Sequence, residues 1–177
     1  MNFDAKEFGE EVAGILGLDG DGHRLMPLVA AECSSEEARR RLGRRTAAEL
    51  FPRAAAPEAA LAGLWLYFSC FEEAHTAAQD IPTPDGSFWH GILHRQEPDA
   101  GNAAYWFRRV GSHPIFPALN EEAARSAYAT SAEWDPFGFV DYCESARRAG
   151  GKTALIAMEV QRAEWQLLFR YCARPHP

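Results

Sequence analysis

The amino-acid sequence predicts an all-α fold, a single-domain irregular helical bundle around one long central helix. Apolar residues recur at intervals of three and four along much of the chain, which is the period of an amphipathic helix. No stretch shows the alternation of apolar and polar residues, rich in β-branched side chains, that indicates a strand. The chain has 177 residues, the length of one domain. We therefore expect residues 1–177 to form a single all-α domain.

The first third of the chain predicts four short helices before the central one. They are expected over residues 3–17, 24–32, 34–42 and 46–51. Pro27 interrupts the second of them. Ser34 and Glu37 form the capping-box pattern that opens the third. The fourth ends before Pro52.

The central helix is expected over residues 57–79, with Pro57 in its first turn. Its apolar side chains fall within about 80° of one another on a helical wheel and predict a core-facing stripe: Leu61, Leu64, Trp65, Phe68 and Phe71. Toward its C-terminal end the same stripe becomes polar, with Glu72, His75 and Gln79. A carboxylate in a core position is costly unless it is paired, hydrogen-bonded, protonated or bound to a metal. The stripe therefore indicates either a polar site or a helix end that emerges into solvent.

The second half of the chain predicts a loop and five further helices. The loop covers residues 81–87, which include two prolines and a glycine. Ser87 is expected to cap the next helix, which ends before Pro98. Later helices are expected to start at Asn102, at Asn120 and at Asp135, and the last one covers about residues 152–172.

The helix after this loop carries a pattern typical of metal ligands. His90 and His94 are four residues apart, so one helical turn brings both imidazoles to the same side, and Glu97 follows at the next turn. A short loop favours an antiparallel pairing of this helix with the central one. At about 1.5 Å per residue, His75 then falls at a depth between His90 and His94, and Glu72 falls between His94 and Glu97. The sequence therefore predicts a site where three histidines and two carboxylates meet.

Four further residues are candidates for ligand binding. Arg95 lies close to the apolar side of its helix, which indicates a buried and paired guanidinium that could orient the ligands. Tyr105, Arg108 and Arg109 share the polar face of the following helix. Two interpretations of these arginines stay open. They form a clamp for a carboxylate or another anion, or they form salt bridges to the acids at the end of the preceding helix.

These residues favour a metal-dependent enzyme of the hydrolase or oxygenase type. His75, His90 and His94 would bind one divalent transition metal, Zn, Mn, Fe or Ni. Glu72 and Glu97 are the candidate catalytic carboxylates, Glu72 as a fourth ligand or general base and Glu97 beside the ligands. Two alternatives stay open: a metal-free site that uses histidine and glutamate as acid and base, and a non-catalytic ligand-binding or interaction domain whose polar cluster is structural.

The charge and hydropathy of the sequence indicate which kinds of partner to expect. The formal net charge of −7 does not favour nucleic-acid binding, which needs a positive field. No apolar run is long enough for a membrane span, and the first residues do not resemble a signal peptide. We expect a soluble cytoplasmic protein that binds a small molecule, with self-association left open. The four cysteines form no CxxC pair and are expected to be free, buried thiols.

One segment resembles a known family. Residues 86–114 read GSFWHGILHRQEPDAGNAAYWFRRVGSHP. This string is similar to the pattern GSFWHxxxHRxExDxxNAxYWFRRVGxHP of an uncharacterised family of bacterial and fungal proteins, and the similarity extends over about residues 61–117. No activity is established for that family, so the resemblance implies no reaction. It points to the same histidines as the helical spacing.

Overall fold

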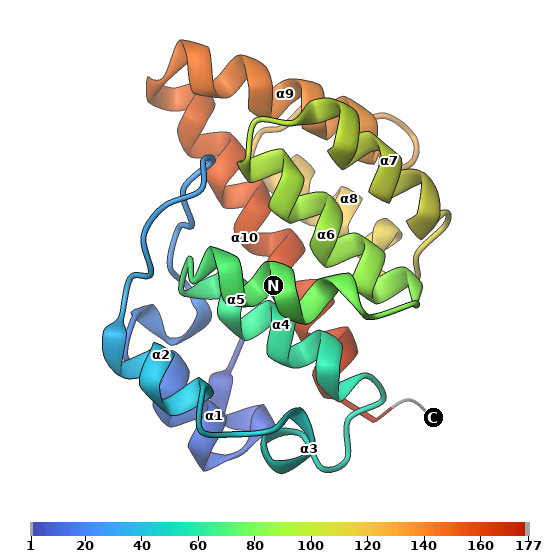
Figure 1. Ribbon diagram of the computed structural model, residues 1–177. Helices are drawn as coiled ribbons and strands as arrows, with labels where there is room; N and C mark the ends of the chain where they lie inside the picture. The colour runs from blue at the N-terminus through green and yellow to red at the C-terminus, as the bar shows by residue number, and fades with distance from the viewer. Residues whose placement is uncertain (1, 176–177) are drawn as a thin grey trace.

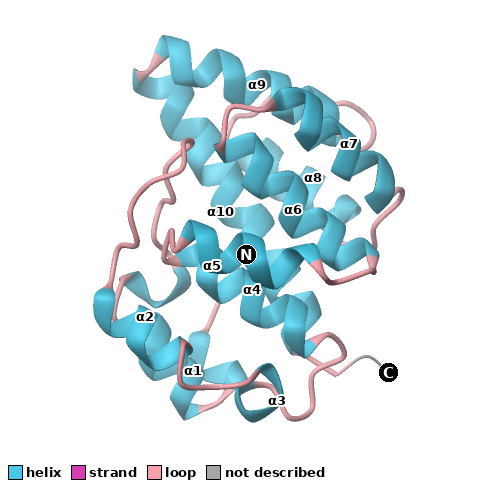
Figure 2. Ribbon diagram, in the orientation of Figure 1, coloured by secondary structure: helices cyan, strands magenta, loops and turns pink. Residues whose placement is uncertain are grey.

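A computed structural model describes residues 2–175 and is all-α, which confirms the predicted fold class (Figures 1 and 2). Over this range the chain contains no strand. Its elements are two short 3-10 helices and ten α-helices: η1 (Ala5–Phe8), α1 (Glu10–Leu16), η2 (Gly20–Gly22), α2 (Glu36–Leu42), α3 (Ala47–Leu50), α4 (Pro57–Tyr67), α5 (Phe71–Gln79), α6 (Pro84–Gln96), α7 (Ala100–Val110), α8 (Phe116–Arg125), α9 (Pro136–Ala149) and α10 (Gly151–Ala173).

The longest helix, α10, organises the core. It packs against α4, α8 and α9 (Figure 1). The indole of Trp165 stacks on Phe169 with ring centroids 4.9 Å apart, and its Nε1 donates a hydrogen bond of 2.7 Å to the carbonyl of Gly63 in α4. Helix α6 lies between α5 and α7 and contacts both. The three-helix group α5–α6–α7 carries the residues that the sequence singles out.

The expected central helix over residues 57–79 is two helices, α4 and α5. The chain leaves the helical path at Ser69, whose φ is +56°. The amide of Cys70 donates to the carbonyl of Trp65, and the amide of Ser69 donates to that of Leu66. This is the Schellman arrangement that ends many helices, usually with glycine at the left-handed position. The break changes the direction of the chain, so the stripe of α4 does not continue along α5.

Other boundaries also differ from the sequence-based expectation. No helix forms over residues 24–32; instead the side-chain amide of Gln161 in α10 donates to the carbonyls of Met26 and Pro27 and holds this segment extended against the core. Helix α6 begins four residues earlier than expected, because the Thr83 hydroxyl, not that of Ser87, accepts the capping hydrogen bond.

The expectation of four free thiols is wrong for one pair. Cys33 and Cys70 form a disulfide, whereas Cys143 and Cys172 are free and buried. The two bonded cysteines are 37 residues apart in sequence. They meet because the loop before α2 runs along the α4–α5 break, where the amide of Ser34 donates to the carbonyl of Phe68 over 2.7 Å. No local sequence pattern reports such a long-range contact.

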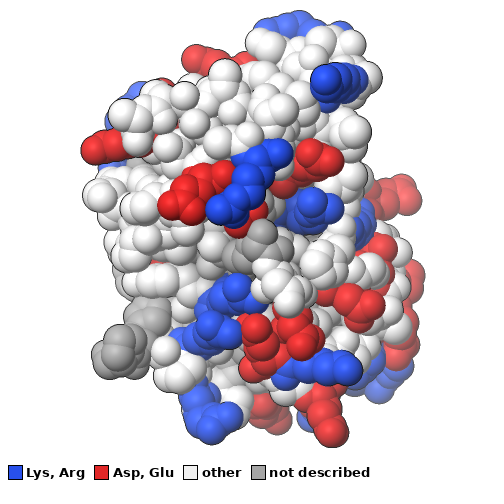
Figure 3. Space-filling model, turned by 180° about the vertical axis from the view of Figure 1, so that it is seen from behind, with Lys and Arg blue, Asp and Glu red and all other residues white. Residues whose placement is uncertain are grey.

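The surface seen from behind carries charges of both signs. Acidic and basic side chains lie next to one another over the middle and lower parts of that face (Figure 3). No extended basic patch is seen among the described residues on this face. None of the helices described is both long and apolar enough to cross a lipid bilayer.

Candidate metal centre

Three histidines from two helices meet beside the α5–α6 loop. His75 comes from α5, and His90 and His94 come from α6. One ring nitrogen from each lies within 4.8 Å of the others, and this is the one such group of metal-binding side chains found in residues 2–175. The Nε2 atoms of His75 and His90 are 3.3 Å apart. The three residues that the sequence predicts as metal ligands are therefore close enough to hold one ion.

Helical geometry explains this convergence. His90 and His94 are one turn apart on α6, and their rings are stacked at 5.2 Å with an angle of 21° between their planes. The loop over residues 80–83 lets α5 pack back on α6. His75 then meets both rings edge-on, with centroids 4.6 Å from His90 and 5.4 Å from His94. Two rings on one helix and one ring from the neighbouring helix form a three-sided arrangement.

The cluster is largely removed from water. The side chain of His90 is 2% exposed, His94 is also buried, and His75 is half-buried. Burial first, and then the nearby His75 and His94, lower the pKa of His90 to about 4, against a smaller opposing effect of the Ala78 backbone. His90 is therefore neutral at pH 7. Neutral imidazole is the form that binds a metal.

An aromatic wall fixes the orientation of His90. The indole of Trp106 in α7 stacks on the His90 ring, with centroids 4.0 Å apart and an angle of 12° between the planes. Trp106 itself is half-buried, at the edge of the histidine cluster. A ring held face to face against an indole has little freedom to turn, so the direction of the His90 nitrogens is set in advance.

Polar groups surround His94. Its Nδ1 lies 2.6 Å from Oε2 of Glu97, which lies one turn further along the chain. A carboxylate at Nδ1 holds the proton there and leaves Nε2 free for a metal, the usual arrangement around metal-binding histidines. The side-chain nitrogen of Asn102 lies 3.2 Å from Nε2 and 3.3 Å from Nδ1.

Sequence reasoning missed the roles of Asn102 and Trp106. The sequence predicts Asn102 only as the start of a helix, whereas the N-cap residue of α7 is Asp99. The signal that could have found both is their spacing of four residues, which places them on the same face of a helix that follows the HxxxH helix after a short turn.

Glu72 lies outside the three-histidine group. Its side chain is exposed, in the first turn of α5, and lines a surface pocket with Glu73 and Thr76. The α4–α5 break explains this placement, because Glu72 no longer continues the apolar stripe of the preceding helix. The structure therefore brings Glu97, but not Glu72, into contact with a histidine of the cluster.

Arg95 faces the core of the bundle. Its guanidinium is paired with the fully buried carboxylate of Glu164 in α10, with a second contact to Gln161. It also lies 4.6 Å from the ring centre of Phe139. Burial, the largest single effect, would lower the pKa of Arg95, but the charge of Glu164, the hydrogen bond to Glu164 and the nearby Cys143 together raise it. None of these partners is a histidine of the cluster, so Arg95 acts on the site only through the helix that it shares with His90 and His94.

The other candidate ligand-binding residues lie on the outside of α7. Tyr105, Arg108 and Arg109 are exposed. The Arg109 guanidinium lies 5.4 Å from the ring centre of Trp106 and 5.9 Å from that of Tyr105. Neither arginine forms an ion pair with another residue in 2–175, so salt bridges to the acids at the end of α6 are not formed. Arg109 thus lies one aromatic ring away from His90.

No family model, curated protein or solved structure matches this chain. What the site does is therefore inferred from its own chemistry: three imidazoles, one carboxylate bound to a histidine, an amide and an aromatic wall.

Proposed function

We propose that this protein is a metal-dependent enzyme that binds one divalent transition metal through His75, His90 and His94 and acts on a small molecule. The observation that carries the proposal is the convergence of three ring nitrogens within 4.8 Å, from two helices. Two nitrogens bound to one tetrahedral zinc at about 2.0–2.1 Å are roughly 3.3 Å apart. His75 and His90 already have their Nε2 atoms at 3.3 Å.

The residue types in the histidine cluster favour a group of metal ligands over a hydrogen-bond network that only stabilises the fold. A structural cluster in a protein interior normally pairs donors with acceptors or opposite charges. Here three bases face one another, and the only carboxylate bound to them in the described chain is Glu97, at Nδ1 of His94. A divalent cation between the rings would supply the positive charge that these lone pairs lack.

The three imidazoles leave further coordination positions for water or substrate. A bound metal supplies Lewis acidity or an activated water, which serves hydrolysis, or a site for oxygen chemistry. Nitrogen ligands favour Zn, Fe or Ni over Mn, which prefers oxygen. Within the chain, Glu97 holds the His94 tautomer, and the side-chain nitrogen of Asn102 lies 3.2 Å from Nε2 of the same ring.

The first experiment is elemental analysis of protein purified without a histidine tag or chelator. We expect about one equivalent of a transition metal per chain in the wild type. The variants His90→Ala and His94→Ala should lose it, because each removes one of three ligands. His23→Ala is the matched control, since His23 is exposed and outside the cluster, and it should keep the metal.

Thermal denaturation supplies a second readout for the same proposal. Added metal at about 100 times its dissociation constant should stabilise the wild type by about 2.7 kcal/mol, a rise in Tm of about 5–11 °C. The two cluster variants should show no such rise. If the wild type neither contains a metal nor gains stability from added Zn, Mn, Fe or Ni, the proposal is wrong and the histidine cluster is structural.

A further inference from the structure

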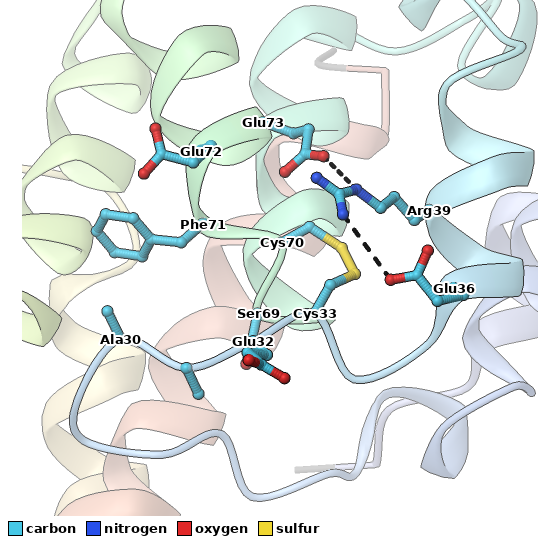
Figure 4. A pocket seen from close by; sticks show the side chains of 11 residues that line it. Ala30, Glu32, Cys33, Glu36, Arg39, Ser69, Cys70, Phe71, Glu72 and Glu73 are labelled. Carbon is cyan, nitrogen blue, oxygen red and sulfur yellow. Dashed lines mark hydrogen bonds and ion pairs between the residues drawn. A yellow bond between two sulfur atoms is a disulfide. The ribbon is translucent and has the colours of Figure 1, made fainter.

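A second site lies where the loop before α2 meets the start of α5. A pocket of about 710 Å³ opens there, and the Cys33–Cys70 disulfide lies in its wall (Figure 4). The pocket is built from two chain segments, residues 30–39 and residues 69–73. It uses none of the three histidines. A disulfide that faces a solvent-filled pocket is open to small reagents, unlike one packed in a core.

The two sulfur atoms differ in access and in surroundings. Cys33 is half-buried, whereas Cys70 is 1% exposed. A nucleophile in the pocket therefore reaches Sγ of Cys33 first. Cys70 is the N-cap residue of α5, where no side chain accepts a hydrogen bond from the free amides of the first turn. A thiolate at such a position is stabilised by these amides and by the helix dipole, which makes Cys70 the better leaving group.

The pocket is negatively charged. Glu32, Glu36, Glu72 and Glu73 line it together with one cation, Arg39. The guanidinium of Arg39 is paired with Glu73 at 2.5 Å and with Glu36 at 3.8 Å, which Figure 4 shows as dashed lines. Glu32 and Glu72 form no ion pair with another residue in the described chain. Their uncompensated charge attracts cations and repels anions.

We propose that the Cys33–Cys70 disulfide is redox-active and exchanges with small thiols that carry a positive charge, with Cys33 as the point of attack. A thiolate RS⁻ attacks Sγ of Cys33, a new RS–S bond forms, the bond to Cys70 breaks, and Cys70 leaves as a thiolate. A second RS⁻ then attacks the mixed disulfide and releases RSSR and the Cys33 thiolate. Two external thiols are oxidised to one disulfide, the protein disulfide is reduced, and the protons of the two thiols pass to Cys33 and Cys70.

The other two cysteines provide an internal reference. Burial raises the pKa of Cys143 to about 11 and raises that of Cys172 well above its usual value. Both stay protonated and covered at neutral pH, so neither takes part in exchange on the same time scale. Mass spectrometry of the intact chain can therefore assign a mixed disulfide to the Cys33–Cys70 pair.

The test compares three reagents of similar size on the full-length wild-type protein, first oxidised with cystamine. These are cysteamine, 2-mercaptoethanol and 3-mercaptopropionate, which are cationic, neutral and anionic. Alkylation and mass spectrometry measure the rate at which the disulfide is lost. This rate is divided by the concentration of thiolate, so that the three reagents are compared by their second-order rate constants. Cysteamine should react at least ~5-fold faster than 3-mercaptopropionate at low salt. The ratio should approach one at about 0.5 M salt, where the Debye length is roughly 4 Å.

Peptide mapping and a charge variant complete the design. A trapped mixed disulfide should be on Cys33, not on Cys70. The double variant Glu32→Gln/Glu72→Gln should lower the ratio between the cationic and anionic reagents, because it removes the two unpaired charges. Three results would overturn the proposal: a pair that stays as two thiols after cystamine, a disulfide that reacts only in denaturant, or equal rates for the three reagents.

Discussion

Two neighbouring residues of α6 belong to buried clusters of opposite character. Arg95 and Glu164 bring together one positive and one negative charge, each at most 1% exposed. His94, the preceding residue, belongs to a group of three bases whose one carboxylate partner in the described chain is the 37%-exposed Glu97. The first cluster neutralises itself within the chain. The second has more lone pairs than donors, and this surplus is what would let it bind the proposed metal cation, whereas the first pair joins two helices.

The largest effect should come from breaking the self-neutralised pair. Arg95→Ala leaves the carboxylate of Glu164 buried without its counter-charge, and we expect the free energy of unfolding to fall by about 3–5 kcal/mol. For a chain of this length that is a fall in Tm of about 6–20 °C, measurable by thermal or urea denaturation. The double variant Arg95→Met/Glu164→Leu should recover most of the loss. A single variant that costs under about 1 kcal/mol would show that the pair is not structural.

A smaller effect, confined to the histidine cluster, is expected for Glu97→Gln. The variant removes the carboxylate that orients His94, so the metal affinity should fall about 10–100-fold. Without metal the free energy of unfolding should change by less than about 1 kcal/mol, because the Glu97 side chain is 37% exposed. Competition with a chelator of known affinity measures the difference. Glu58→Gln is the control, because it makes the same change at an exposed residue that forms no ion pair with another residue in 2–175. Equal affinities for both variants would contradict the orienting role.

The smallest effect on the metal is expected for Glu72→Gln. Glu72 is exposed and outside the three-histidine group, so the metal affinity should change by less than about twofold and the free energy of unfolding by less than about 0.5 kcal/mol. The same chelator competition and denaturation experiments report both values. A tenfold loss of affinity would instead place Glu72 among the ligands, as its position on a continuous helical wheel predicts.

The histidine cluster was predictable because its geometry is local. The spacing of His90 and His94 within one turn, and the short loop between them and His75, fix the three rings through helix geometry alone. Helical spacing and the lack of strand patterns likewise predict the all-α fold, which the structure confirms.

The break at Ser69 could not be predicted from local sequence. No glycine or proline marks it, although the left-handed conformation there usually requires glycine. It depends on contacts with the loop before α2, including the bond between Cys33 and Cys70. The wrong prediction that Glu72 lies in the histidine site follows from the break at Ser69. A helical wheel drawn through residues 57–79 assumes an unbroken helix.

The closeness of the three histidines along the chain has a consequence for folding. They lie within residues 75–94, on helices joined by residues 80–83. Closing so short a loop costs little entropy, whereas the contacts of α10 with α4 join segments about a hundred residues apart, as between Trp165 and Gly63, and such distant contacts form late. A metal ion bound by the α5–α6 hairpin would therefore stabilise it before the core assembles around α10. Metal present during refolding would speed folding as well as stabilise the folded protein.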